Sequence, residues 1–133
     1  MALKFQPKEK TVVMCDFSGF KEPEMVKVRP VVVLAKHKHN GRLVTIVPLS
    51  TTEPFVAEKH HHQMSINPLP DKAHITCWAK CDMVYTVSID RLDRYCIGRR
   101  EYVTPSVPDD DFIAIKTAVA CALRLESAPK NLP

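Results

Sequence analysis

Residue types that suit phosphate binding and proton transfer fall at the ends of predicted strands or in the loops between them. Arg29 opens an apolar run, and its planar guanidinium can donate two parallel hydrogen bonds to a phosphate. Lys80 and Asp82 are two positions apart on a segment expected to be extended, so they would point to one face and offer an acid and a base. The candidate set is Glu24, Arg29, Ser50, Thr51, Lys80 and Asp82.

A predicted β-hairpin would position the cation and the hydroxyls. Residues 29–35 form the most strongly β run of the chain, Asn40-Gly41 is a hairpin turn signal, and residues 43–49 supply the returning strand. Arg29 and Ser50 flank that turn at nearly equal separation, so antiparallel pairing would bring them close. A guanidinium and a hydroxyl would then share one end of the hairpin.

The rest of the pattern is that of short strands followed by one helix, which predicts a mainly β fold: a small β-barrel or curled sheet capped by a C-terminal α-helix. The loop over residues 18–28 should be mobile or folded over something. Residues 60–66 should alternate, with His60, His62, Met64 and Ile66 on one face. We expect further strands over 11–17 (buried on both faces), 75–80, 83–89 and about 101–104, and a short helix over 88–94. A final helix should begin at Asp109, with Phe112, Ile115, Val119 and Leu123 as its buried stripe.

Composition is that of one ordinary globular domain. The chain has 133 residues, of which 45% are hydrophobic and 26% charged, which argues against disorder. We expect an N-terminal arm over 1–9, a domain over 10–126 and a flexible tail over 127–133. The apolar runs are too short for a membrane span and residues 1–8 do not resemble a secretory signal, so a cytoplasmic protein without membrane partners is expected. The net charge of +4 is compatible with nucleic acid.

Common catalytic motifs are missing from the sequence: there is no phosphate-binding glycine loop, no Gly-x-Ser-x-Gly and no His-Glu-x-x-His. Cys77 and Cys81 could join His60 and His62 on a zinc ion. However, Cys-x-x-x-Cys lacks the tight spacing of a zinc knuckle, and cysteines in strand-rich segments commonly pack as small apolar side chains. With five cysteines in all, we expect buried thiols, no disulfide and no metal.

Several segments, in their order and spacing, resemble the MazF/PemK family, the endoribonuclease toxins of toxin-antitoxin pairs. The resemblance runs from about Lys10 to Leu125, and its most specific element is the joint pattern of Asp-Phe, Glu, Arg-Pro before an apolar strand, and Val-Pro-x-Ser/Thr-Thr after a hairpin. The loop at 17–20 and the segment 85–93 resemble a longer-loop, PemK-like branch. The matching residues are Met14-Cys15-Asp16-Phe17, Glu24, Arg29-Pro30-Val31-Val32-Val33-Leu34, Val47-Pro48-Leu49-Ser50-Thr51 and Asp82-Met83-Val84.

The resemblance implies an SH3-like barrel with a C-terminal helix, a homodimer, a cognate antitoxin partner, and cleavage of single-stranded RNA such as mRNA without a metal cofactor. Arg29 matches the family's catalytic arginine, and Ser50 stands where the family usually has threonine. Thr51 matches a second hydroxyl residue of some members. The remaining matches are Glu24 to an acidic loop residue, Asp82 to the acidic position after the late strand, and Lys80 to a position where certain members have arginine.

RNA carries its own nucleophile, the 2′-hydroxyl, so cleavage needs a base, a cation for the phosphorane and an acid for the leaving oxygen. Arg29 would stabilise the phosphorane, and Ser50 or Thr51 would donate a hydrogen bond to a phosphoryl oxygen. Asp82 or Glu24 would act as the base. The alternative is a barrel that binds RNA or a partner protein without cutting. Residues expected to contact RNA are Phe20, Lys21, Lys27, His60, His62 and Trp78, although Phe20 and Trp78 could equally be core or dimer contacts.

Overall fold

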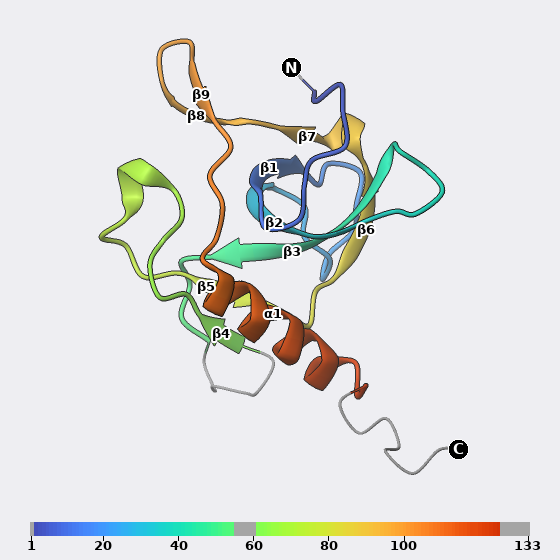
Figure 1. Ribbon diagram of the computed structural model, residues 1–133, viewed down its shortest axis with the longest axis vertical. Helices are drawn as coiled ribbons and strands as arrows, with labels where there is room; N and C mark the ends of the chain where they lie inside the picture. The colour runs from blue at the N-terminus through green and yellow to red at the C-terminus, as the bar shows by residue number, and fades with distance from the viewer. Residues whose placement is uncertain (1, 55–60, 126–133) are drawn as a thin grey trace.

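The computed structural model describes residues 2–54 and 61–125 as one curled sheet with a helix against it (Figure 1). The strand order is β4-β5-β3-β2-β1-β7, β6 also pairs with β3, and β8 and β9 form a separate hairpin. The mainly β class with a C-terminal helix is therefore confirmed, as a sheet whose described strands do not close into a full barrel. The elements are β1 (Val12–Asp16), β2 (Val28–Lys36), β3 (Leu43–Ser50), β4 (His61–Gln63), η1 (Pro70–Lys72), β5 (Trp78–Lys80), β6 (Tyr85–Ser88), η2 (Ile89–Arg91), β7 (Leu92–Asp93), β8 (Tyr95–Gly98), β9 (Glu101–Val103) and α1 (Asp109–Ala122).

The β2–β3 hairpin is the centre of the sheet and forms where it was predicted. Val31 pairs with Pro48 and Val32 with Val47, in antiparallel register. The connection spans residues 37–42 and is longer than the two-residue turn that Asn40-Gly41 suggests. The side-chain oxygen of Asn40 accepts a hydrogen bond from the Arg42 backbone N–H at 3.0 Å. The backbone carbonyl of Asn40 accepts one from the Leu43 backbone N–H at 3.1 Å. Asparagine thus closes the loop by its side chain.

The central strands are buried on both faces, as predicted for residues 11–17. Alternate side chains enter two separate hydrophobic cores because successive residues of a strand point to opposite faces. Val12, Val32 and Val47 pack in the core under α1, whereas Val13 and Ile46 pack in the core on the other face. β-branched side chains suit such strands, since they pack well on a pleated surface.

Helix α1 lies across one side of the sheet, beside β4 and β5 (Figure 1). Phe112, Ile115 and Val119 are buried as predicted, but Leu123 is 49% exposed. The prediction for Leu123 is wrong because the helix ends at Ala122, before the stripe completes another turn. Ala118 takes part in the buried face instead.

Several short elements differ from the sequence predictions. The strand expected over 60–66 is only β4 in the described part, and Ile66 is 49% exposed, so the predicted alternation ends at Met64. The strand expected over 75–80 is reduced to β5, and the helix expected over 88–94 is a single turn, η2, followed by β7. Strands β7 and β8 were not predicted, because two to four residues are too few to show a period.

The loop over residues 18–27 is folded against the sheet by one arginine. Arg91 Nη1 donates hydrogen bonds to the carbonyl oxygens of Asp16 and Ser18, at 2.9 and 2.8 Å. Its guanidinium carbon lies 4.6 Å from the ring centroid of Phe20. Of the two outcomes expected for this loop, the folded one is observed.

No helix among the described residues combines the length and the apolar character needed to cross a membrane.

Candidate functional site: a donor-lined pocket at the end of the central hairpin

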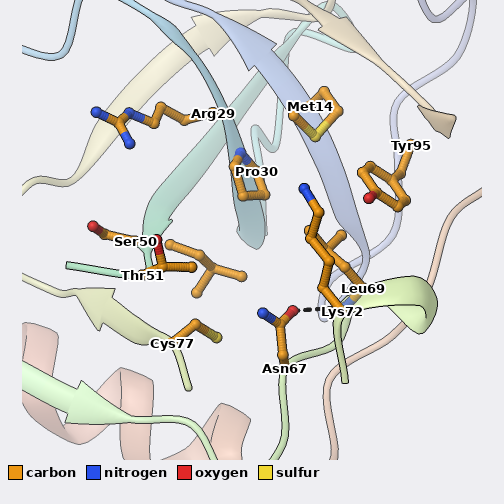
Figure 2. Close-up of a pocket in the computed structure, with 11 residues that line it drawn as sticks. Met14, Arg29, Pro30, Ser50, Thr51, Asn67, Leu69, Lys72, Cys77 and Tyr95 are labelled. Atoms are coloured by element: carbon orange, nitrogen blue, oxygen red, sulfur yellow. Dashed lines mark hydrogen bonds between the residues drawn. The ribbon is translucent and has the colours of Figure 1, made fainter. Parts of the chain in front are cut away.

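A pocket opens where β2 begins and β3 ends, with a cavity volume of about 170 Å³ (Figure 2). It is smaller than the sites that enclose a drug-sized ligand, which measure roughly 300–1,000 Å³. Strands, a turn of 3-10 helix and the start of β8 all contribute to its walls. The residues that line it are Met14, Arg29, Pro30, Leu49, Ser50, Thr51, Asn67, Leu69, Lys72, Cys77 and Tyr95.

Arg29 is the part of this pocket that the sequence indicated most directly. It is the second residue of β2 and pairs with Cys15 of β1, so its backbone is held by a central strand. The Nε atom of Arg29 is buried and has no hydrogen-bond partner in the described structure. A buried donor left in this way costs stability. Arg29 as a whole is only half-buried, so the rest of its guanidinium can donate to an anionic ligand in the pocket.

Ser50 and Thr51 line the same pocket as Arg29, as the hairpin geometry predicted. Ser50 is the last residue of β3 and pairs with Trp78 of β5. Its Oγ accepts a hydrogen bond from the Thr52 backbone N–H at 3.0 Å, which orients the side chain and leaves the hydroxyl hydrogen able to donate. The pocket thus combines a guanidinium and hydroxyl groups on the hairpin side (Figure 2).

The acidic and lysine candidates lie outside the pocket lining. Glu24 is exposed in its loop, where Oε1 accepts a hydrogen bond from the Lys21 backbone N–H at 2.7 Å. Lys80 and Asp82 do not share the face of an extended segment, so that prediction is wrong. The chain turns between Lys80 and Met83, where the Met83 N–H donates to the Lys80 carbonyl at 3.0 Å. The turn lets β5 and β6 pair with successive parts of β3.

The expected RNA contacts are spread over several surfaces. Phe20 packs against Phe17 and Tyr85, with ring centroids 5.5 Å apart in each pair, so it belongs to an aromatic cluster. His62 Nε2 lies 2.9 Å from Asp111 Oδ1 at the start of α1. Trp78 is half-buried beside Ser50. Lys21 and Lys27 are both exposed in the 18–27 loop, and His60 lies outside the described residues.

Among the polar residues of the pocket, sequence reasoning missed three: Asn67, Lys72 and Tyr95. Asn67 is 6% exposed, and its Oδ1 accepts a hydrogen bond from the Leu69 backbone N–H at 3.0 Å. Lys72 ends η1, with its ammonium 5.9 Å from the ring centroid of Tyr95. The one signal in the sequence was the Asn-Pro-x-Pro punctuation of residues 67–70, which marks a loop with a fixed conformation.

The cysteines considered for zinc are buried in the core under α1. Burial raises the pKa of Cys77 to about 11 and that of Cys81 to about 12. Residues 2–54 and 61–125 contain no group of three or more His, Cys, Asp or Glu side chains placed to hold a metal ion. His60, one of the ligands weighed for zinc, is outside those residues.

Sequence and structure comparisons place the chain in a known family. Residues 8–123 match the model of the PemK-like, MazF-like toxins of type II toxin-antitoxin systems, and the chain belongs to this family. It is 32% identical over 140 residues to YifN, an uncharacterized protein of Escherichia coli (strain K12), covering 90% of this chain and 93% of YifN.

Two solved structures show the same fold. An endoribonuclease from a mycobacterial species, in complex with its cognate antitoxin, superimposes with a TM-score of 0.64 and 24% identity, covering 90% of this chain and 96% of that one. MazF from Deinococcus radiodurans superimposes with a TM-score of 0.68 and 15% identity, covering 91% and 99%. The predicted family resemblance and fold class are thus confirmed.

Proposed function

We propose that this protein is an endoribonuclease that cleaves single-stranded RNA, including mRNA, without a metal ion, as the toxin of a type II toxin-antitoxin pair. The observation that carries the proposal is that Arg29, whose buried Nε has no hydrogen-bond partner in the described structure, lines the same pocket as Ser50 and Thr51. An oxyanion is the ligand that such a donor set suits. Family membership and the named endoribonucleases of the same fold support the same reaction.

The 2′-hydroxyl oxygen of the ribose attacks the adjacent phosphorus, and the bond from phosphorus to the 5′-oxygen of the next nucleotide breaks. Arg29 binds the phosphoryl oxygens, whose negative charge grows in the phosphorane. Ser50 or Thr51 donates a further hydrogen bond to one of them. The products are a 2′,3′-cyclic phosphate and a 5′-hydroxyl.

Removal of the proton from the 2′-hydroxyl is assigned to Glu24 or Asp82. Lys80 is the candidate acid that protonates the leaving oxygen. All three lie outside the pocket lining, so this assignment rests on the family positions that they match. Glu24→Gln and Asp82→Asn, each compared with wild type over a range of pH, test it. The true base is the residue whose loss removes the ascending, acidic limb of the pH–rate profile.

RNA binding is assigned to the side chains around the pocket. Trp78 lies next to Ser50 across the β3–β5 pair, and Lys21 and Lys27 provide exposed positive charge in the 18–27 loop. His60, His62 and Phe20 complete the set proposed from the sequence. A homodimer and a cognate antitoxin are proposed on family grounds, since a mycobacterial endoribonuclease of this fold was solved with its antitoxin.

The test is cleavage of single-stranded RNA in EDTA by wild type and Arg29→Ala. We expect wild type to leave cyclic phosphate ends, and Arg29→Ala to be slower by about 10² to 10³, the usual loss when one donor to a transition-state anion is removed. Arg42→Ala is the matched control: Arg42 is an exposed arginine that pairs with Asp90 outside the pocket. Magnesium dependence with 5′-phosphate products would contradict the mechanism.

One observation favours a second candidate, a barrel that binds RNA or a partner protein without cleaving it. Among the described residues, no carboxylate lines the pocket. RNA that binds wild type and is recovered intact, with weaker binding by Arg29→Ala, would identify this function.

A further inference from the structure

Asn67 presents a fixed hydrogen-bond donor to the pocket. Its Oδ1 accepts from the Leu69 backbone N–H at 3.0 Å, and only the oxygen of the amide can accept, so the orientation of the side chain is determined. The NH₂ group must lie on the opposite side, and Figure 2 shows it turned toward the cavity. Asn67 is 6% exposed and its side-chain oxygen is engaged by the Leu69 N–H, so the NH₂ group is the part of the side chain left to bind a ligand in the pocket.

Lys72 adds a second donor to the lining of the same pocket. Its ammonium lies 5.9 Å from the ring centroid of Tyr95. The Tyr95 hydroxyl donates to Asp71 Oδ1 at 2.7 Å, outside the pocket lining, so Tyr95 contributes mainly its ring. In Figure 2, Lys72, Leu69 and Tyr95 lie across the pocket from Arg29 and Ser50.

These two ends of the pocket differ in character. The Arg29 end carries the guanidinium and hydroxyl groups that suit a phosphate. The Lys72 end combines donors with apolar surface from Leu69, Tyr95 and Met14, which suits the flat face of a base better than a second, fully charged phosphate. A nucleobase has apolar faces and a polar edge, and so matches both features.

We propose that Asn67 and Lys72 select a nucleobase with a keto oxygen at purine C6 or pyrimidine C4, guanine or uracil, next to the phosphate held at Arg29. The proposal rests on the proposed RNA-binding function of the pocket. Amide NH₂ and ammonium groups only donate, so they pair with O6 and N7 of guanine or with O4 of uracil. Adenine and cytosine carry an amino group at the corresponding ring atom, and it would meet the two donors with its own hydrogens. Asn67 and Lys72 are therefore specificity-determining residues.

Binding of uncleavable homopolymers tests this without relying on cleavage or on a known target sequence. The probes are hexamers of 2′-O-methyl uridine, inosine, adenosine and cytidine, in which inosine presents the O6 and N7 of guanine. By fluorescence anisotropy, we expect wild type to bind the uridine or inosine hexamer, or both, about tenfold more tightly than the other two, as expected for one or two base-edge hydrogen bonds. Which keto base is preferred identifies the base that the pocket takes.

Two variants separate base selection from general affinity. Asn67→Asp keeps the oxygen that accepts from Leu69 and replaces the NH₂ group by an acceptor, so the preference should vanish or reverse. Lys72→Gln should reduce the same preference, and it stands alone if Asn67→Asp does not fold. Lys38→Gln is the control, because Lys38 is exposed in the hairpin loop outside the pocket and should lower all four affinities by one factor.

Equal affinity of wild type for the four hexamers, or a preference unchanged in both variants, would overturn the proposal. An equal loss of affinity for all four hexamers in Lys72→Gln would show that Lys72 binds a phosphate. That result would also overturn the proposal. A wild-type protein that shows the preference but leaves unmodified RNA intact would contradict the nuclease function and leave base selection standing.

Discussion

The imidazole of His62 and the carboxylate of Asp111 join β4 to the first turn of α1, with Nε2 and Oδ1 2.9 Å apart. The same carboxylate accepts hydrogen bonds from the backbone N–H and the hydroxyl of Ser65. Asp111 is 3% exposed and lies at the helix N-terminus, where a negative charge is favoured. One buried carboxylate therefore fastens the helix to the edge of the sheet.

Asp111→Asn should lower the free energy of unfolding at pH 7. The substitution removes the charge and leaves buried donors of Ser65 and His62 poorly satisfied, a loss of about 1 to 3 kcal/mol. Urea unfolding measures it. Asp110→Asn, at the exposed neighbouring position, is the control and should change stability by less than about 0.5 kcal/mol. Equal stability of the two variants would contradict the role of Asp111.

The advantage of wild type over Asp111→Asn should depend on pH. Burial raises the pKa of Asp111, but the hydrogen bonds from Ser65 and His62 outweigh it and hold the pKa below the ordinary value of 3.8. A carboxyl whose pKa is lower in the folded state stabilises the fold fully above that ordinary value and loses the contribution as the pH falls through the folded-state pKa. Unfolding curves from pH 7 to pH 3 should show the difference shrinking only below about pH 4. A constant difference would contradict this assignment.

Arg29→Met should leave the fold as stable as wild type or make it more stable. The buried Nε of Arg29 has no partner in the described structure, and removing such a donor relieves a cost of about 1 to 3 kcal/mol, part of which the methionine side chain should recover. Thermal unfolding checks this. Arg42→Met, which loses an exposed ion pair with Asp90, should be unchanged or less stable by about 0 to 1 kcal/mol. A destabilised Arg29→Met would show that Arg29 serves the fold.

Arg91→Ala should release the 18–27 loop. The substitution removes two hydrogen bonds to backbone carbonyls and the contact with the Phe20 ring. Together they are worth about 1 to 2 kcal/mol, so amide exchange in the loop should accelerate about tenfold. Hydrogen exchange read by mass spectrometry should localise the effect to peptides containing Phe20 and Glu24, and Arg42→Ala should show none of it. Exchange spread evenly over the chain would indicate a general loss of stability.

The thiols should differ sharply in reactivity. Burial raises the pKa of Cys15 and of Cys81 to about 12 and that of Cys77 to about 11, whereas Cys96 is exposed. Because the thiolate is the reactive form, iodoacetamide at pH 8 should modify Cys96 in the native protein and reach Cys15, Cys77 and Cys81 only in urea. Peptide mass mapping distinguishes the sites. Native alkylation of Cys77 would mean that the core under α1 opens readily.

The half of the pocket on the β2–β3 hairpin could be predicted because local signals specify it. A β-branched run and the Asn40 turn fix the pairing, and the pairing places Arg29 and Ser50 at one end. Asn67 and Lys72 could not be found in this way. Their segment has no hydrophobic period, and its position depends on tertiary contacts such as the burial of Leu69.

The errors have a similar cause. Lys80 and Asp82 were treated as one extended segment, but a turn there allows the chain to pair twice along β3. The stripe through Leu123 assumed that the helix continued, and short strands such as β7 form only because a partner strand is present. Local propensity gives way where pairing with distant residues is stronger.

The lining of the pocket runs from Met14 to Tyr95 along the chain and requires six separate stretches to meet. A chain still being translated has no complete cavity until Tyr95 has left the ribosome and the long-range pairs of the sheet have formed. The pocket, and with it the site of the proposed activity, is therefore absent during most of the chain's own synthesis.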